Sequence, residues 1–537
     1  MLKALQNKPY LFWALVGAAI YIPFLGSTHL FDWDEVNFAE SAREMIVTGD
    51  FFSVQINFQP FWEKPPLFLW LQALSFIAFD SFSGQSDISM EFAARFPNAV
   101  IGIVTLCTLY AIGKKTWNEN FGHLWAFSYL VAITPHVYAS SGIIDPLFNL
   151  LIFLGVYFFA EFFKDSSRYR PVILAGISIG LALLTKGPAA LLLWSLTLLF
   201  VGVLYRSRVT KRLFTGAVVA GLISVSFFAA WYGLIAYKFG WQIIEEFFTY
   251  QVRLMTTGDA GHGQPFYYHF VVLLLGCFPI SIWAGARLFR WKREDLDFSN
   301  WMKVLFWVVL ILFSIVKTKI VHYSSMCWIP LSYFSALVLQ EWQWEGYRWN
   351  WKNLTAMGLV GLLLAVVLAA VPLIGQNAGA ITPYIQDVFV QGNLQAPVYW
   401  AGWEFLIGVA YGVSVIYFLF TKKLHSLMSS SIVVIMAYMA VVVPKIEGYT
   451  QATVIDFYIA KVGQKVYIEP VGFKSYAHLL YFQKPAGTPA GDVLLAAKKL
   501  DRPAFFIMKA DAEDRFKYHP NLIFLKEENG FLFYKHR

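Results

Sequence analysis

Two adjacent carboxylates, Asp34 and Glu35, begin a stretch with helical periodicity. A helix N-terminus favours acidic side chains, so the pair has a structural explanation as well as a chemical one. In the chemical interpretation, one fixed carboxylate takes a proton from an acceptor hydroxyl. The apolar residues Val36, Ala39 and Ile46 share one face, which predicts an amphipathic helix lying on a membrane surface.

A second acid and base, Glu63 and Lys64, stand directly before Pro65-Pro66. The paired prolines fix the backbone, so both side chains are presented rigidly where an apolar run begins. A snorkelling lysine beside a surface glutamate is the structural alternative. Carboxylate and imidazole are compatible metal ligands, so Glu63 and His262 form a candidate site for a divalent ion such as Zn, Mg or Mn.

Asp145 and Lys186 stand at the edges of apolar runs. A charge at or inside a membrane is costly and usually has both a partner and a task. Further polar candidates follow in the chain, namely Arg253, Asp259, His262, Lys317, Lys319 and His322. Each residue alone is weak evidence, but acids, cations and histidines on one side would suit transfer from a phosphate leaving group.

Five cations are candidates for binding the phosphate of such a donor: Lys64, Lys186, Arg253, Lys317 and Lys319. Cations neutralise the charge that develops on the leaving phosphate, and a carboxylate such as Asp34 or Glu35 takes the acceptor proton.

Thirteen apolar segments are long enough to be membrane spans by the rule of about 20 residues per crossing. Their approximate limits are 9–28, 92–113, 121–139, 143–163, 171–184, 188–205, 213–236, 267–288, 302–317, 323–340, 354–375, 401–421 and 427–444. The fifth is short, and the pair around Thr185-Lys186-Gly187-Pro188 has a re-entrant unit as its alternative. The prediction is a polytopic all-α membrane domain.

Alternate short loops carry two to four cations each, for example Arg206, Arg208, Lys211 and Arg212. This is the positive-inside bias, with the N-terminus in the cytoplasm. Four long segments are then predicted outside: 29–91, 237–266, 376–400 and 445–537. They and the outer turns hold every candidate named above, so the chemistry is expected on one face.

Residues 1–444 are expected to form the transmembrane domain, with interfacial helices in the outer loop 29–91. Residues 445–537 alternate helix-like and strand-like runs, such as Lys465–Ile468, Ala504–Ile507 and Leu522–Leu525. This pattern predicts a small extramembrane α/β domain.

The composition agrees with a membrane protein, because 58% of the 537 residues are apolar and only 14% are charged. A soluble domain of this length needs more polar surface. The net charge of +8 does not indicate nucleic-acid binding, since the basic residues lie in short loops between apolar runs. Cys107, Cys277 and Cys327 all lie in apolar runs and are expected to be buried free thiols.

The acidic segment also carries a family resemblance. Asp34-Glu35, Ala39-Glu40, Ala42-Arg43-Glu44-Met45 and Gly49-Asp50 resemble the DE-x-x-x-AE-x-AREM-x-x-x-GD signature of GT-C membrane glycosyltransferases. Further blocks follow in the same order: Glu63 to Leu67, Ala94 to Pro97, Thr185 to Pro188, His262 with Pro265-Phe266, and Ser314 to Lys319. The resemblance covers roughly residues 10–340. It is closest to the lipid A aminoarabinose transferases and more distant from protein O-mannosyltransferases.

The resemblance implies an inverting transfer from a polyprenyl (undecaprenyl) phosphate sugar donor to a lipid A-like or other lipid or glycan acceptor. It also implies a location in the inner membrane, with a periplasmic active site and C-terminal domain. Asp34 would be the catalytic carboxylate and Lys64 would bind the lipid phosphate, while Glu63 and His262 would hold the divalent ion.

One position departs from the family. Aminoarabinose transferases often carry Arg three residues after the first Asp, where this chain has Asn37. A salt bridge from that position to Asp145 is therefore impossible. Asn37 and Asp145 remain the residues expected at the acceptor pocket, and the identity of the sugar and acceptor is left open.

Two other functions compete with the lipid-linked glycosyltransferase. One is a protein O-mannosyltransferase-like enzyme, whose acceptor is a protein. The other is a transporter or flippase for a lipid-linked sugar, which would place polar groups near mid-membrane in broken helices and often shows internal repeats. The charges here lie in outer loops and no repeat is evident, which favours an enzyme.

Overall fold

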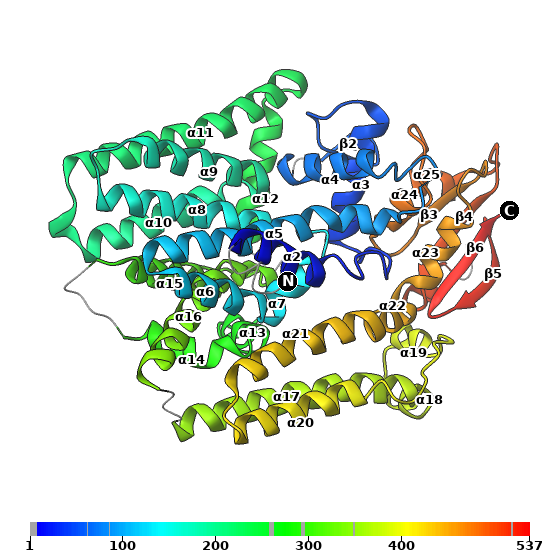
Figure 1. Ribbon diagram of the computed structural model, residues 1–537. Helices are drawn as coiled ribbons and strands as arrows, with labels where there is room; N and C mark the ends of the chain where they lie inside the picture. Colours follow the sequence, from blue (N-terminus) through cyan, green and yellow to red (C-terminus); the bar gives the residue numbers. More distant parts are fainter. Residues whose placement is uncertain are drawn as a thin grey trace.

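Long helices lying roughly side by side form most of the molecule, and a small sheet domain packs against one end of them (Figure 1). The computed structural model describes residues 8–61, 63–84, 86–256, 263–290, 296–346, 350–516 and 519–537. The main bundle contains α2 (Pro9–Tyr21), α4 (Leu67–Ala78), α5 (Met90–Thr116), α6 (Glu119–Leu130), α7 (Ile133–Ala139), α8 (Asp145–Lys164), α9 (Arg170–Lys186), α10 (Ala189–Leu204), α11 (Lys211–Phe239), α12 (Gln242–Thr256), α13 (Tyr268–Gly276), α14 (Ile280–Leu288), α15 (Phe298–Ile315) and α16 (Trp328–Glu345).

A second group of helices follows in the chain and packs along one side of the bundle (Figure 1). It contains α17 (Trp351–Gln376), α18 (Ala378–Ile381), α19 (Val388–Leu394), α20 (Leu406–Phe420) and α21 (Leu424–Val441). Helix α20 packs against both α17 and α21, and α21 contacts α7 of the main bundle.

Six helices in the described part of the chain are long and apolar enough to cross a membrane: α5, α8, α11, α15, α17 and the continuous stretch Leu424–Thr450. Each of the thirteen predicted apolar segments coincides with one helix or with two consecutive helices. The predicted segment 121–139, for example, is α6 followed by α7. The membrane-protein fold class is confirmed, while the number of crossings stays a prediction.

The chain reverses between α9 and α10 at Gly187, whose φ of +80° is readily available only to glycine. Pro188 then precedes α10. This turn leaves Lys186 as the last residue of α9. The two segments are thus separate helices of 17 and 16 residues.

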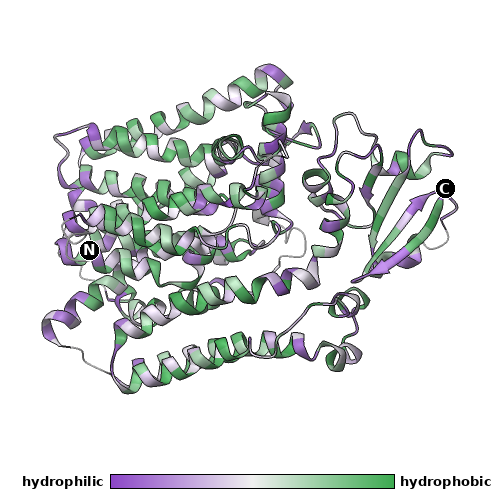
Figure 2. Cartoon of the chain, turned by 45° about the vertical axis from the view of Figure 1, so that its right-hand side comes forward, coloured by the Kyte–Doolittle hydropathy of each residue, from purple (hydrophilic) through white to green (hydrophobic). Residues whose placement is uncertain are grey.

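Hydrophobic residues dominate the long helices, and hydrophilic residues gather at their ends (Figure 2). Helix α8 runs from Asp145 to Lys164, and α9 returns from Arg170 to Lys186. The cation-rich loops that follow α8 and α10 therefore lie at the end of the bundle opposite Asp145 and Lys186.

Helix α3 (Asp34–Thr48) is enclosed by protein, because residues 35–45 are all buried. Val36 packs in an apolar cluster that includes Ile455 and Leu480 of the C-terminal segment. On the polar side, Arg43 forms two hydrogen bonds of 2.6 and 2.7 Å with Glu40. The predicted helix is present, and its apolar face packs against the C-terminal segment. Its position on a membrane surface stays a prediction.

The C-terminal segment forms a four-stranded sheet with helices, as predicted. Helices α22 (Val443–Thr450) and α23 (Ala452–Ile459) lead into it. The strand order is β3-β4-β6-β5, with β3 parallel to β4 and the other pairs antiparallel. The strands are β3 (Tyr467–Pro470), β4 (Ala504–Lys509), β5 (Leu522–Glu528) and β6 (Phe531–His536), and the helices between them are α24 (Ala477–Tyr481), α25 (Gly491–Ala496) and α26 (Glu513–Phe516).

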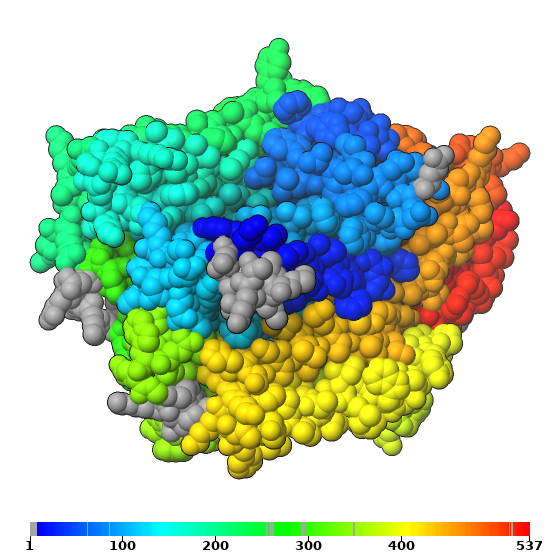
Figure 3. Space-filling view, viewed as in Figure 1, coloured from blue at the N-terminus to red at the C-terminus, as the bar shows by residue number. Residues whose placement is uncertain are grey.

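Strand β6 was not predicted, although its turn is encoded locally. Asn529 and Gly530 join β5 to β6 with φ angles of +51° and +76°. An Asn-Gly pair with both φ angles positive is the preferred two-residue hairpin turn. The C-terminal domain lies directly against the N-terminal third of the chain, as the contact of orange with blue surface shows (Figure 3).

Candidate active site

A small cavity of about 90 Å³ opens at the end of the bundle that carries Asp145 and Lys186. Glu63, Lys64 and His322 share its lining with these two residues. The five come from segments far apart in the sequence: the loop before α4, the first residue of α8, the last residue of α9 and the turn η3 (Val321–Cys327). Two acids, two lysines and one histidine are thus brought together by the tertiary structure.

The buried Asp145 and the half-buried Lys186 form an ion pair in which Nζ lies 2.6 Å from Oδ1. Pro146 follows Asp145 in the first turn of α8. A backbone N–H at this position has no intrahelical partner, so proline loses no hydrogen bond there. The Lys186 ammonium also lies 5.3 Å from the ring centroid of Tyr323. Lys186 therefore supplies the partner for Asp145 that Asn37 cannot supply, and the ion pair links α8 to α9.

His322 lies among four charged groups, since Asp145, Lys186, Asp34 and Lys64 all act on its imidazole. Burial lowers the pKa of His322 below its usual value, while the two acids raise it and the two lysines lower it further. The imidazole is therefore neutral near pH 7, a state in which one ring nitrogen donates and the other accepts a hydrogen bond.

Glu35 is fully engaged by its neighbours. Arg95 Nε and Nη2 donate to its two oxygens at 2.9 and 2.8 Å, and the backbone N–H groups of Gly142 and Phe31 donate at 2.5 and 2.9 Å. Burial disfavours the charge, yet Arg95 and these donors hold the pKa of Glu35 below its usual value. Glu35 thus joins α3, α5 and the turn before α8, and it has little capacity left to act on a substrate.

Asp34 has a different environment from its neighbour. It follows Trp33 at the start of α3 and is half-buried rather than buried. Its carboxylate acts electrostatically on His322. The side chain therefore stands close to the charged cavity while keeping contact with solvent.

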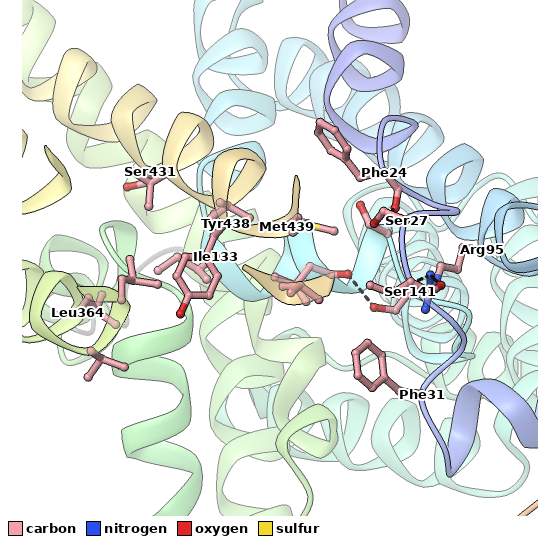
Figure 4. Close-up of a pocket in the computed structure, with 18 of the residues that line it drawn as sticks. Phe24, Ser27, Phe31, Arg95, Ile133, Ser141, Leu364, Ser431, Tyr438 and Met439 are labelled. Atoms are coloured by element: carbon pink, nitrogen blue, oxygen red, sulfur yellow. Dashed lines mark hydrogen bonds between the residues drawn. The ribbon is translucent and has the colours of Figure 1, made fainter. Parts of the chain in front are cut away.

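A second cavity, of about 290 Å³ and mostly apolar, lies between the N-terminal loop and the helices of the second group (Figure 4). Phe24, Phe31 and Arg95 lie on one side, and Leu364 and Tyr438 lie opposite. Glu35 and Arg95, which form the ion pair described above, also line this cavity. Its apolar walls suit a hydrocarbon chain.

The structure does not bring the other predicted phosphate ligands to the charged cavity. Arg253 lines a separate hollow on α12 with Glu245 and Glu246. Lys317 is exposed, and Lys319 is buried with its ammonium donating to the carbonyl of Val316 at 2.7 Å.

Asn37 lines neither of the two cavities and is only 1% exposed. Its predicted place with Asp145 at an acceptor pocket therefore stays a prediction. Asp259 and His262 lie outside the described residues, so the structure does not place them.

Sequence reasoning missed the contribution of the C-terminal domain. Tyr476 of this domain lies near enough to Glu63 for the carboxylate to act on its hydroxyl. Its ring packs on Trp33, with centroids 4.9 Å apart. No local pattern marks a residue that is more than 400 positions from its partners, so only the tertiary structure reveals it.

The described residues do not by themselves supply a metal centre. No group of three His, Cys, Asp or Glu side chains with metal-binding geometry occurs among them. Of the predicted ligand pair, Glu63 borders the charged cavity, and His262 is outside the described part.

The comparisons with known proteins agree with the geometry. A family model described as dolichyl-phosphate-mannose-protein mannosyltransferase matches residues 63–231. The ArnT of Cupriavidus metallidurans, solved bound to undecaprenyl phosphate, superposes with a TM-score of 0.76 over 98% of this chain and 97% of that one, at 17% identity. The protein has the GT-C fold of ArnT.

Other relatives support the same grouping. The undecaprenyl phosphate-alpha-4-amino-4-deoxy-L-arabinose arabinosyl transferase of Pectobacterium atrosepticum is 26% identical over 368 residues, which are 65% of this chain and 63% of that protein. The enzyme of the same name from Yersinia enterocolitica is 25% identical over 76% of this chain and 73% of its own length. The predicted resemblance to ArnT-like GT-C proteins is thus confirmed across most of the chain.

Proposed function

We propose that this protein is an inverting membrane glycosyltransferase that moves a sugar from a polyprenyl phosphate, such as undecaprenyl phosphate, to a lipid A-like or other lipid or glycan acceptor. The observation that carries the proposal is the charged cavity lined by Glu63, Lys64, Asp145, Lys186 and His322. Lysines suit a lipid phosphate, and the carboxylate of Asp34 beside them suits an attacking hydroxyl. The ArnT of Cupriavidus metallidurans binds undecaprenyl phosphate, and the Pectobacterium atrosepticum relative is an undecaprenyl phosphate-alpha-4-amino-4-deoxy-L-arabinose arabinosyl transferase.

In the reaction, Asp34 takes the proton of the acceptor hydroxyl as its oxygen attacks the anomeric carbon. The bond from that carbon to the phosphate oxygen breaks on the opposite face, so the configuration inverts. Lys64 and Lys186 neutralise the charge that remains on the lipid phosphate. Asp145 keeps Lys186 in place through their 2.6 Å ion pair.

Glu35 has a structural role in this mechanism. Its ion pair with Arg95 fixes the first turn of α3, and so it fixes the position of the adjacent Asp34. The proposal therefore separates the two acids that the sequence presented together as catalytic candidates. Asp34 takes the proton, and Glu35 holds Asp34 in position.

The apolar cavity beside Glu35 and Arg95 suits a lipid chain of the donor or the acceptor. The cation-rich loops lie at the opposite end of the bundle, and by the positive-inside rule this supports a periplasmic active site and C-terminal domain. A reporter fused after Arg208 is expected in the cytoplasm, and one at Arg537 in the periplasm. A cytoplasmic C-terminus would contradict this orientation.

Glu63 and His262 remain the proposed holders of a divalent ion, Zn, Mg or Mn. Such an ion would supply positive charge next to the lipid phosphate. Of this pair, only Glu63 lies in the described part of the chain. The proton transfer and the phosphate contacts proposed here need only Asp34, Lys64 and Lys186.

A transporter or flippase is the second candidate, and the position of the charges disfavours it. The ion pair and Lys64 lie at one end of the bundle rather than at its middle, where they line a small cavity. An O-mannosyltransferase-like activity differs only in the acceptor.

The test uses purified full-length protein in nanodiscs. Undecaprenyl phosphate is expected to bind, and Lys64→Ala is expected to weaken this binding by about tenfold or more, as loss of a charge-assisted contact to phosphate should. Exposed Lys422→Ala, at the opposite end, is the matched control. Unchanged affinity in Lys64→Ala would remove the phosphate role, and absence of binding by the wild type would overturn the proposed function.

A further inference from the structure

One buried side chain of the charged cavity takes no part in the ion pair or in the proposed proton transfer. Asn149 lies on α8 four residues after Asp145, so one helical turn brings both residues to the same face. It lines the cavity together with Lys186 and is only 2% exposed. The amide of Asn149 therefore stands beside the groups that the proposed mechanism assigns to the lipid phosphate.

This amide is held at one of its two polar atoms. The hydroxyl of Ser325, a residue of η3 that also lines the cavity, donates to Asn149 Oδ1 at 3.2 Å. Asn149 Nδ2 is buried as well, and it has no hydrogen-bond partner within the described ranges of the chain. A buried amide N–H without an acceptor is costly, so we expect a group from outside the chain to accept from it.

Asn98, a buried asparagine at the same end of the bundle, shows the opposite arrangement. Its Nδ2 donates to the carbonyls of Ser141 and Ile143 at 2.5 and 2.6 Å. The two bonds use both hydrogens of that amide, and they hold the turn that leads into α8. Asn98 thus serves the fold with its donors, whereas the donors of Asn149 remain for a ligand in the cavity.

The lining of the cavity specifies the kind of acceptor. Lys64 and Lys186 line it beside Asn149, so three side chains offer hydrogen-bond donors to the same small space. A phosphate suits them, because its several oxygens accept charge-assisted hydrogen bonds from ammonium and amide groups together. Leu192, Leu312 and Phe313 form apolar parts of the lining, which suits a hydrocarbon chain attached to the phosphate.

We propose that Asn149 Nδ2 donates to an oxygen of the donor's lipid phosphate, and that Ser325 holds the amide in the orientation that this bond requires. Asn149 is then a third phosphate ligand beside Lys64 and Lys186, and Ser325 is a positioning residue. The bond strengthens as negative charge develops on the phosphate during transfer. The inference rests on the proposed function and adds two residues to its donor site.

The experiment measures binding of undecaprenyl phosphate, and of undecaprenol, which lacks the phosphate, to full-length protein in nanodiscs. Asn149→Asp keeps the size of the side chain and an acceptor for Ser325, but it replaces the N–H donor by a negative charge. It should weaken undecaprenyl phosphate binding by about tenfold or more, and Asn149→Ala should weaken it by about three- to tenfold. Neither change should alter the affinity for undecaprenol.

Ser325→Ala should weaken binding of the phosphate-bearing lipid alone, by about two- to fivefold. Ser325→Thr keeps the hydroxyl and should restore the affinity. Asn350→Asp is the matched control, because it makes the same exchange of atoms at the exposed N-cap of α17, where Asp caps as well as Asn.

Unchanged undecaprenyl phosphate affinity in both Asn149 variants would overturn the inference, since Nδ2 would then meet only an ordered water. Equal losses for undecaprenyl phosphate and undecaprenol would also overturn it, because Asn149 would then act on the shape of the cavity and not on the phosphate. In both cases Lys64→Ala still tests the proposed function separately. A wild-type protein that does not bind undecaprenyl phosphate would overturn the proposed function and this inference together.

Discussion

Two acid–cation pairs with buried carboxylates lie at the same end of the bundle, and they differ in the hydrogen-bonding capacity that they leave for a ligand. Glu35 accepts four hydrogen bonds, two from Arg95 and two from backbone N–H groups. Asp145 accepts one from Lys186, and this pair faces a cavity with Lys64. The same chemistry thus serves structure where every lone pair is satisfied, and ligand binding where donors and acceptors remain directed into a cavity.

The contrast is sharpest between adjacent residues, Asp34 and Glu35. Removing the base with Asp34→Asn should reduce transfer by about 10²–10⁴-fold, the usual contribution of general base catalysis, while donor binding and folding persist. Turnover and undecaprenyl phosphate affinity are measured on the same preparation. Asn serves nearly as well as Asp at a helix start, so near-normal transfer would leave Asp34 with a structural role only.

Breaking the ion pair between Glu35 and Arg95 should lower the stability of the protein instead of removing a reacting group. Arg95→Ala leaves the buried Glu35 carboxylate without its cation, which typically costs about 3–5 kcal/mol of folding free energy. A large fall in the apparent unfolding temperature in detergent is expected. Arg95→Ala together with Glu35→Gln removes the uncompensated charge and should recover part of the loss. A fully stable Arg95→Ala protein with impaired transfer would move Arg95 into the reaction.

The metal proposal has a smaller expected effect. Glu63→Ala and His262→Ala should each reduce transfer by about 10–100-fold if they share an ion, as loss of metal-site groups usually does. The double variant should then cost little more than either single one, and metal content measured by mass spectrometry should fall in all three. Fully additive losses would show that the two residues act separately.

Glu44 provides the mildest test, far from the cavity on the same helix. Burial and the charge of Glu40 raise the pKa of Glu44 to about 9. Because the folded state holds the proton more tightly than the unfolded state, stability is greatest below the unfolded pKa and falls as pH rises toward 9. Glu44→Gln keeps the hydrogen bonds of the neutral side chain but cannot ionise. Its unfolding temperature should therefore exceed that of the wild type by about 2–4 °C at pH 9 and by less at pH 6. A pH-independent difference would contradict the raised pKa.

The sequence by itself determined the membrane fold class, the helical segments and the candidates Asp34, Lys64, Asp145 and Lys186. Apolar run length, loop charge and proline or glycine positions are local properties that a chain displays without its tertiary structure. It also indicated that buried charges need partners.

Only the tertiary structure decided which partners they have. It pairs Lys186 with Asp145, and Arg95 with Glu35. It also places Arg253 and Lys317 outside the lining of the charged cavity. It also enclosed α3 beneath the C-terminal domain and brought Tyr476 beside Trp33. Such contacts join residues tens to hundreds of positions apart, and packing of whole elements selects among them. The residue types alone are compatible with several pairings, and they do not specify which one forms.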